Sequence, residues 1–268
     1  MPEILQHGFM QRALLAGLII AVVCPLIGVF LVLRRLSLIA DTLSHVALAG
    51  IAIGLFAGIP PILAALVVAL AGGLGIEALR TRGRLSGEAA LAVFLSGGLA
   101  VAIVLIGLAR GFTVDLFGYL FGSITTVAPL DLWVIGALGA VTAGTVLVLY
   151  KDLFAVTFDE EAARTSGMPV AALNLLLTVL TALVVVLSMR IVGILLVSAL
   201  LVIPALAAMR VATSFRGTVG AAVAFAVGAV LLGLVAAFYL DVAAGGAIVL
   251  VALGMFAAAS VVGRGKTA

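Results

Sequence analysis

The sequence predicts an all-α integral membrane protein, a polytopic bundle of about eight or nine transmembrane helices. The first observation is composition: 66% of the 268 residues are apolar and 9% are charged, and the mean hydropathy is +1.47. A soluble domain carries about 25% charged residues, so this chain cannot cover its surface in water. The second observation is the length of the apolar runs. They extend over roughly 20 residues, as membrane helices require, and do not alternate over about ten residues as barrel strands do.

Charged residues and Gly or Pro breaks divide the chain into nine candidate spans. They are expected at residues 12–33, 36–58, 60–79, 89–108, 131–150, 170–189, 191–209, 217–240 and 244–262. Counts of eight or ten stay open, because only Met189 and Arg190 separate the sixth span from the seventh. The segment 109–130 is too short between Asp115 and Asp131 to cross a bilayer. It is predicted to be an interfacial or re-entrant helix on the outside.

The Lys and Arg residues are distributed unevenly over the connections between these spans. Eleven of the 14 fall in one alternating set of connections and three fall in the other. Positive charge in short loops favours the cytoplasm, so we expect the N-terminus outside and the C-terminus inside the cell (inner) membrane. This pattern sets orientation in the lipid bilayer, and it does not indicate a nucleic-acid partner.

The stretch RRLSLIADTLSHVALAG, residues 34–50, places a carboxylate and an imidazole at the front of an apolar run. Asp41 and His45 stand at i and i+4, so they share one helix face. If the helix begins at Thr42, Asp41 is an N-cap, a position that Asp favours. If the helix begins near Leu36, the pair lies several residues inside the membrane. Ionisable groups at that depth usually face a cavity or a partner.

One carboxylate and one imidazole make a weak site, but two copies of the chain about a two-fold axis would double it. Two carboxylates cancel a divalent charge, and neutral imidazoles suit zinc, manganese or iron(II). Cys24 is the only cysteine, so a thiolate site for copper(I) is not expected. The pair therefore predicts a site for a transported divalent metal ion. The alternatives are a proton- or sodium-coupled secondary carrier, with the pair as a proton relay, and a purely structural role.

A second charged segment, YKDLFAVTFDEEAARTSGMPV, connects the fifth and sixth spans at residues 150–170. Asp159 and Glu160 are expected on a short helix that ends near Gly167, a helix-stopping residue. These residues by themselves fit either a solvated cytoplasmic loop or a docking helix for a soluble partner.

Three motifs together give the chain a resemblance to a known family. FDEEAARTSGMPV resembles the cytoplasmic coupling segment of the ABC-type permeases that import zinc, manganese or iron. GILLVSALLVIPALAA, which contains Pro204, is similar to the most recognisable stretch of that family, and LFGYLFGSI fits it as well. An Asp followed four residues later by His, behind a basic inner loop, is the third motif. The order and spacing of the motifs agree from about residue 10 to residue 262.

The resemblance implies a single permease domain over residues 1–268, with a coupling helix at about 156–168. Asp41 and His45 then match the residues that face the translocation path at the interface of a homodimer. The positions that match the coupling helix, which fits a groove on the ATPase subunit, are Asp159, Glu160, Ala163 and Gly167. Further implied partners are two cytoplasmic ATPase subunits and an extracytoplasmic metal-binding protein.

The sequence also predicts what the chain leaves to its partners. It contains no GxxxxGK[ST] phosphate loop and no HExxH zinc-protease motif. We therefore expect a transporter subunit and not an enzyme, with ATP bound on a separate subunit. The divalent metal is expected as cargo, with no permanently bound cofactor. Protonation of His45 should oppose metal binding, because a ligand imidazole must be neutral.

Overall fold

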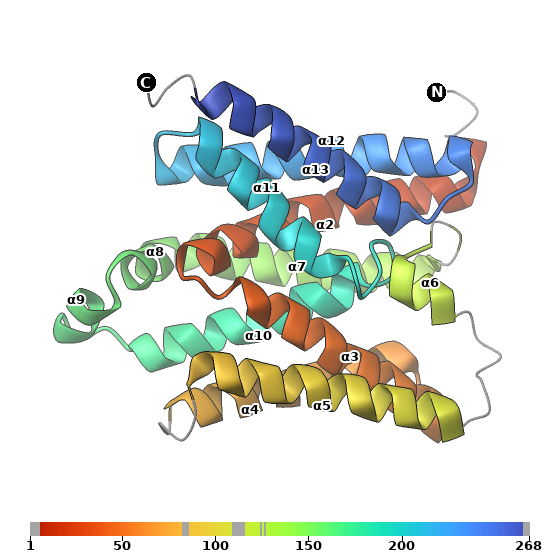
Figure 1. Ribbon diagram of the computed structural model, residues 1–268, viewed down its shortest axis with the longest axis horizontal. Helices are drawn as coiled ribbons and strands as arrows, with labels where there is room; N and C mark the ends of the chain where they lie inside the picture. Colours follow the sequence, from red (N-terminus) through yellow and green to blue (C-terminus); the bar gives the residue numbers. More distant parts are fainter. Residues whose placement is uncertain (1–5, 82–85, 109–115, 124, 126, 265–268) are drawn as a thin grey trace.

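The computed structural model describes residues 6–81, 86–108, 116–123, 125 and 127–264 (Figure 1). Within these ranges the secondary structure is helical. The helices are α2 (Gly8–Leu33), α3 (Ser37–Ala57), α4 (Pro61–Thr81), α5 (Gly87–Leu108), α6 (Leu116–Phe121), α7 (Pro129–Val148), α8 (Tyr150–Phe158), α9 (Glu160–Thr165), α10 (Val170–Ser188), α11 (Val197–Val211), α12 (Phe215–Leu240) and α13 (Ala244–Arg264).

Eight of the described helices are long and apolar enough to cross a membrane, and α11 is a ninth, shorter apolar helix of 15 residues. This agrees with the predicted eight or nine helices. In Figure 1 the long helices run between two ends of the molecule. The connection formed by α8 and α9 lies at one end with the close of α2 and the close of α13, and α6 lies at the opposite end. The start of α2 and the end of α13 are therefore on opposite sides.

The seventh predicted span, 191–209, begins too early. Residues 189–196 form turns, and α11 starts only at Val197. Gly193 breaks the helix with a φ of 85°, a left-handed value that glycine adopts at little cost. The turn is supported by backbone hydrogen bonds to α6, because Ile194 N donates to Tyr119 O at 2.9 Å and Leu195 N donates to Leu120 O at 3.2 Å. With six residues, α6 is too short to span a membrane. It packs against the turn that precedes α11.

The helices α2, α3 and α10 form the most buried part of the bundle, while α5 and α7 lie at its periphery. Close approach between α3 and its neighbours depends on glycines. A Cβ on Gly50 would meet the backbone of Ala65 in α4 at 2.5 Å, and a Cβ on Gly98 in α5 would meet the carbonyl oxygen of His45 at 2.9 Å. Small residues allow membrane helices to pack backbone against backbone. α3 is therefore held between α4 and α5.

The coupling helix predicted at 156–168 is in fact two short helices, α8 and α9, separated by Asp159. Asp159 has extended backbone angles (φ −150°, ψ 97°), so it is the N-cap of α9 and does not lie within a helix. α8 is fixed to the bundle by an aromatic cluster, in which the ring of Phe215 lies 4.8 Å from Phe154, 5.6 Å from Tyr150 and 5.4 Å from Phe30. The break arises because the Asp159 side chain caps the following turn.

Candidate functional site

Asp41 and His45 lie within α3, one turn apart, near the end of the bundle that carries α8 and α9. The helix begins at Ser37 with Leu36 as its N-cap residue, so Asp41 is in the second turn. The interpretation of Asp41 as the N-cap is therefore wrong. The apolar run from Leu36 to Ala40 contains no helix breaker, and the helix starts at its beginning.

The geometry of the pair fixes which atom of the imidazole can bind a metal. His45 Nδ1 lies 3.0 Å from the backbone oxygen of Asp41 and 3.9 Å from its Oδ1. A carbonyl oxygen can only accept, so Nδ1 carries the hydrogen, and in the neutral ring Nε2 keeps its lone pair. The carboxylate of Asp41 and Nε2 of His45 are thus available as one oxygen and one nitrogen ligand.

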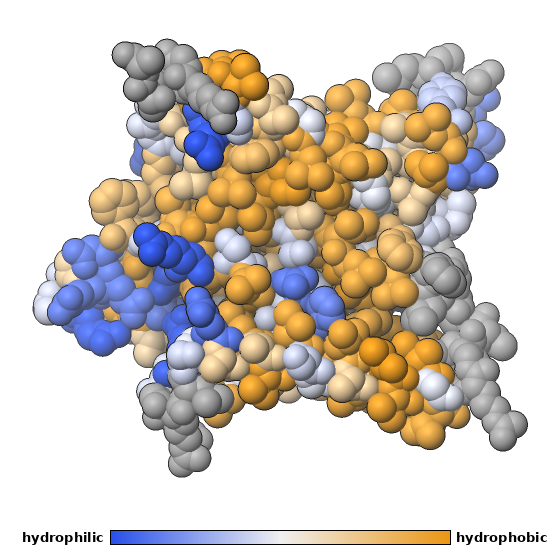
Figure 2. All heavy atoms as spheres, in the orientation of Figure 1, coloured by the Kyte–Doolittle hydropathy of each residue, from blue (hydrophilic) through white to orange (hydrophobic). Residues whose placement is uncertain are grey.

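Both side chains reach the surface of the chain. The side chain of Asp41 is 35% exposed and that of His45 is 14% exposed. From residue 37 to residue 46, the other positions of α3 that are not buried are Ser37 and Leu38. Figure 2 shows the result as a small hydrophilic patch near the centre of a largely hydrophobic face, over the first half of α3. A polar patch on such a face suits a site that a second molecule covers.

The other polar side chains near the pair are already engaged within the bundle. The hydroxyl of Ser44 donates to the carbonyl oxygen of Ala40 at 2.8 Å, and that of Thr42 donates to Leu91 O in α5 at 3.5 Å. Both residues are fully buried. They stabilise the helix and its contact with α5, so neither is a candidate ligand.

The described part of one chain does not complete a metal site. It contains no group of three or more His, Cys, Asp or Glu side chains that could hold an ion. A divalent transition metal usually has at least four ligands, and a single chain offers two here. The remaining ligands must come from another copy of the chain, from water or from the backbone.

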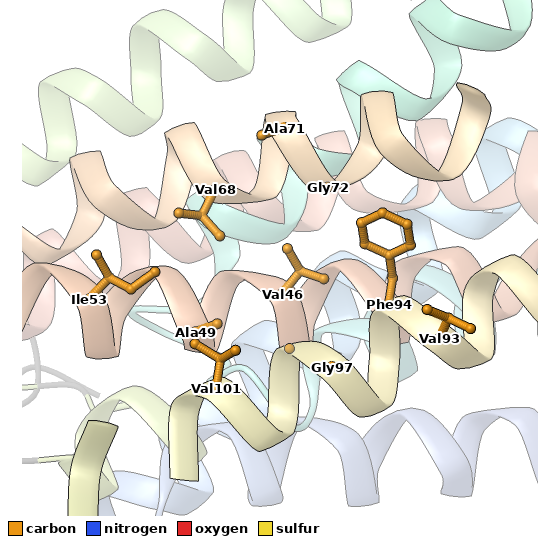
Figure 3. Close-up of a pocket in the computed structure, with 11 residues that line it drawn as sticks. Val46, Ala49, Ile53, Val68, Ala71, Gly72, Val93, Phe94, Gly97 and Val101 are labelled. Atoms are coloured by element: carbon orange, nitrogen blue, oxygen red, sulfur yellow. The ribbon is translucent and has the colours of Figure 1, made fainter. Parts of the chain in front are cut away.

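A groove of about 480 Å³ lies beside the pair, between α4 and α5 (Figure 3). Val46 of α3, Val68 of α4 and Phe94 of α5 converge on it, and the side chains drawn there carry no nitrogen, oxygen or sulfur atom. An apolar groove gives no ligand to a bare cation. The candidate ion site therefore stays with Asp41 and His45.

The predicted docking residues give α9 its form. The Asp159 carboxylate accepts a hydrogen bond from Ala162 N at 2.8 Å, which caps the helix. Ala163 is buried in the core, and Gly167 ends the helix with a φ of 80°. Figure 2 shows that this end of the molecule is strongly hydrophilic, as a surface in contact with water requires.

Glu160, whose side chain is 41% exposed, forms two ion pairs within the chain. Its Oε2 accepts from Arg34 Nη2 at 2.8 Å, and its Oε1 accepts from Arg164 Nη2 at 3.1 Å. Burial lowers the pKa of the Arg34 guanidinium, and the charge of Glu160 opposes this change. The sequence did not reveal this ion pair, because Arg34 precedes Glu160 by 126 positions and the motif gives no sign of the contact.

A second ion pair that the sequence did not reveal lies between the start of α7 and the turn that follows α10. Arg190 Nη1 is 3.3 Å from Asp131 Oδ2, and the Arg190 guanidinium lies 5.5 Å from the centre of the Tyr119 ring. Asp131 also caps α7, since Ala128 N donates to its Oδ2 at 2.9 Å. This pair joins the start of α7 to the end of α10.

Comparison with known proteins assigns the chain to a family. Residues 6–263 match the model of the ABC 3 transport family. The chain belongs to this family. It is therefore the membrane-spanning permease of an ABC transporter, which decides between the ABC-type importer and the secondary carrier that the sequence had left open.

Relatives of similar length support the same assignment. A probable metal transport system membrane protein of Treponema pallidum (strain Nichols) is 37% identical over 98% of this chain and 100% of its own length. The manganese transport system membrane protein MntC of Halalkalibacterium halodurans is 32% identical over 96% of this chain and 88% of its own. The high-affinity zinc uptake system membrane protein ZnuB of Haemophilus influenzae is 32% identical over 91% of this chain and 94% of its own.

The fold is similar to that of a solved structure, PsaBC from Streptococcus pneumoniae in complex with Fab. The superposition has a TM-score of 0.86 with 33% sequence identity, and it covers 96% of this chain and 92% of that chain. The likeness therefore extends over nearly the whole of this chain.

Proposed function

We propose that this chain is the permease subunit of an ATP-driven importer that takes up a divalent transition metal ion, zinc or manganese, with iron(II) in the same chemical class. The observation that carries the proposal is the pair formed by Asp41 and His45, exposed on an apolar face inside the membrane. Manganese and zinc systems stand among the relatives at the same 32% identity. Identity alone therefore does not choose between these two metals.

The permease works as a homodimer in this proposal. Two copies that meet about a two-fold axis along the first half of α3 bring together two carboxylates and two imidazoles. This set balances a 2+ charge and fills four positions with oxygen and nitrogen ligands. The incomplete ligand set of a single chain supports this arrangement.

The energy comes from two cytoplasmic ATPase subunits that dock against α9 and its flanking turns, around Asp159, Glu160, Ala163 and Gly167. An extracytoplasmic metal-binding protein delivers the ion to the opposite face. ATP binding closes the ATPase dimer and displaces α9, and the spans then alternate between outward and inward access. The ion loses its water to the ligands of the pair and is released into the cytoplasm.

The test is uptake of radioactive zinc and manganese by cells that express the complete transporter. Asp41→Asn and His45→Ala permeases are compared with the native chain at matched membrane levels. We expect each change to lower uptake at least about tenfold, since loss of even an outer-shell partner of a metal costs 10- to 100-fold. Co-purification of the ATPase subunit should be unchanged.

Glu88→Gln is the matched control, because Glu88 is an exposed acidic residue at the start of α5, away from the pair. It should transport at the native rate. Native uptake in both the Asp41 and the His45 variants would contradict the proposed site. The metal taken up faster by the native transporter identifies the substrate.

A further inference from the structure

The corner between α2 and α3 is joined to α9 by an ion pair that crosses most of the sequence. Arg34 Nη2 lies 2.8 Å from Glu160 Oε2. Arg34 is the C-cap residue of α2, and Glu160 is the first residue of α9. The pair therefore connects the segment proposed for ATPase docking with the residues that lead into α3.

The two partners are buried to different extents. The side chain of Arg34 is 7% exposed, whereas that of Glu160 is 41% exposed. Removal of one partner from such a pair leaves a charge that water cannot fully solvate, so a pair of this kind holds its geometry more firmly than an exposed one. The second pair of Glu160, with Arg164, has a donor side chain that is 69% exposed, and exposed pairs contribute little.

Backbone hydrogen bonds hold the corner between α2 and α3 in a fixed conformation. Leu36 N donates to Leu31 O at 2.8 Å, and Arg34 N donates to Phe30 O at 3.1 Å. Arg35 adopts a φ of 57°, which reverses the chain within one residue. α3 begins at Ser37, so Asp41 is its fifth residue. A displacement of Arg34 is therefore passed directly to the first turns of α3.

On the other side of the pair, α9 is a helix distinct from α8, and its Ala163 packs in the core. α8 is anchored by the aromatic cluster around Phe215, but the extended backbone at Asp159 separates α9 from α8. A short helix on an extended joint can move as a unit while α8 stays in place. Glu160 follows this joint directly, and its side chain pairs with the buried Arg34 on one oxygen and with the exposed Arg164 on the other.

We propose that the Arg34–Glu160 pair transmits displacement of α9 to the start of α3, and so to Asp41 and His45. This inference rests on the proposed function and deepens it. Arg34 and Glu160 are positioning residues for the ion site, and Glu160 also belongs to the proposed docking segment. Neither residue contacts the metal or the nucleotide in this proposal. Their role is to couple movement of the docking segment to movement of the ion site.

The test uses the complete transporter, permease with ATPase subunits, in liposomes supplied with the metal-loaded binding protein. Zinc or manganese uptake and ATP hydrolysis are measured in the same vesicles. Arg34→Gln should leave ATP hydrolysis within about twofold of native while metal moved per ATP falls at least about fivefold, the lower end of coupling between sites. Glu160→Gln should also lower the metal moved per ATP, but only Arg34→Gln tests unchanged ATP hydrolysis, because Glu160 also belongs to the proposed docking segment.

Two further variants separate coupling from a structural role. Arg34→Lys keeps the charge and should recover part of the uptake per ATP, and the reversed pair Arg34→Glu with Glu160→Arg should exceed either reversed single variant. Arg35→Gln is the matched control, since it removes an exposed cation from the neighbouring position of the same corner. It should remain at the native ratio of metal to ATP.

Native uptake per ATP in Arg34→Gln would overturn the inference. An equal loss of ATP hydrolysis and uptake in Arg34→Gln would also overturn it, because the pair would then serve assembly. Failure of the proposed function is distinguishable, since it appears as native uptake in Asp41→Asn and His45→Ala permeases whose Arg34 and Glu160 are unchanged.

Discussion

At the scale of single residues, the proposed ion site depends on how closely α5 approaches the backbone of His45. Gly98 makes this approach possible, because its missing side chain leaves room for His45 O and Val46 N, each 2.9 Å from where a Cβ would stand. A residue with any side chain at this position must move α5 away from α3. The position of His45 is thus set by a residue that bears no functional group.

Gly98→Ala should therefore destabilise the permease by about 1–3 kcal/mol, the usual cost of overpacking, and should lower metal uptake. Gly97→Ala is the control, because a Cβ there meets nothing within 4 Å. Thermal unfolding in detergent and uptake in cells measure the two effects. Equal behaviour of the two alanine variants would show that contact with α5 does not set the position of His45.

That Asp41 and His45 share one face of α3 could be predicted from the sequence, but their surroundings could not. Spacing at i and i+4 places Asp41 and His45 on one face wherever the helix begins. The choice between an N-cap and a helix interior depends on where α3 starts, and Leu36 as the N-cap residue is not a favoured type. Arg34 as the partner of Glu160 could not be predicted, since contacts between distant segments leave no local pattern.

At the scale of elements, most spans could be predicted because apolar length is a strong signal. α3, α4, α5, α7, α10, α12 and α13 begin and end within two residues of expectation, and α2 begins four residues early. The larger departures are α11 and the pair α8 and α9. Their boundaries depend on the backbone conformation at Gly193 and Asp159. The turn at Gly193 is as apolar as the helix that follows it, so hydropathy alone does not reveal it.

The ion pair of Asp131 and Arg190 holds α7 against α10, with side chains that are 13% and 22% exposed. Asp131→Asn removes the charge from this pair while keeping a side chain that can cap α7. We expect a loss of about 2 kcal/mol, as for a hydrogen bond to a charged group, and a fall in Tm of about 4–8 °C. Thermal unfolding of the detergent-solubilised permease measures this change.

The double variant Asp131→Asn with Arg190→Gln separates loss of attraction from a buried charge left behind. It should unfold at a higher temperature than Asp131→Asn alone, because both charges are removed together. The two side chains would act independently if the double variant lost as much stability as the Asp131→Asn and Arg190→Gln variants lose in sum.

At the scale of the whole molecule, the face that bears Leu38, Asp41 and His45 is proposed to meet its own copy. α7 has no contact of note with α3 and lies beyond α2 and α10. The two helices therefore present different surfaces to the membrane. If the two-fold axis passes along α3, the two copies of Leu38 lie close to each other across the dimer. The two copies of any residue on α7 then lie far apart.

Leu38→Cys should cross-link into a dimer with a bismaleimide reagent in intact membranes, because Leu38 is 58% exposed beside the pair. Leu147→Cys is the control on α7, with 68% of its surface exposed. The native Cys24 is fully buried and gives no background. Dimer bands from Leu147 with none from Leu38, read on a denaturing gel, would place the interface elsewhere.

The turn at residues 189–196 also constrains how the protein can be made. α11 is about 22 Å long at 1.5 Å per residue, shorter than the bilayer core of about 30 Å. Two backbone amides of the turn, those of Ile194 and Leu195, donate to α6, and lipid offers no substitute for those hydrogen bonds. During synthesis α6 leaves the ribosome some 70 residues earlier, so its carbonyls are already present when the turn enters the membrane. The order of segments along the chain is thus part of the instructions for insertion, and a circular permutant that moved α6 behind α11 would deliver the turn to the bilayer before its partner.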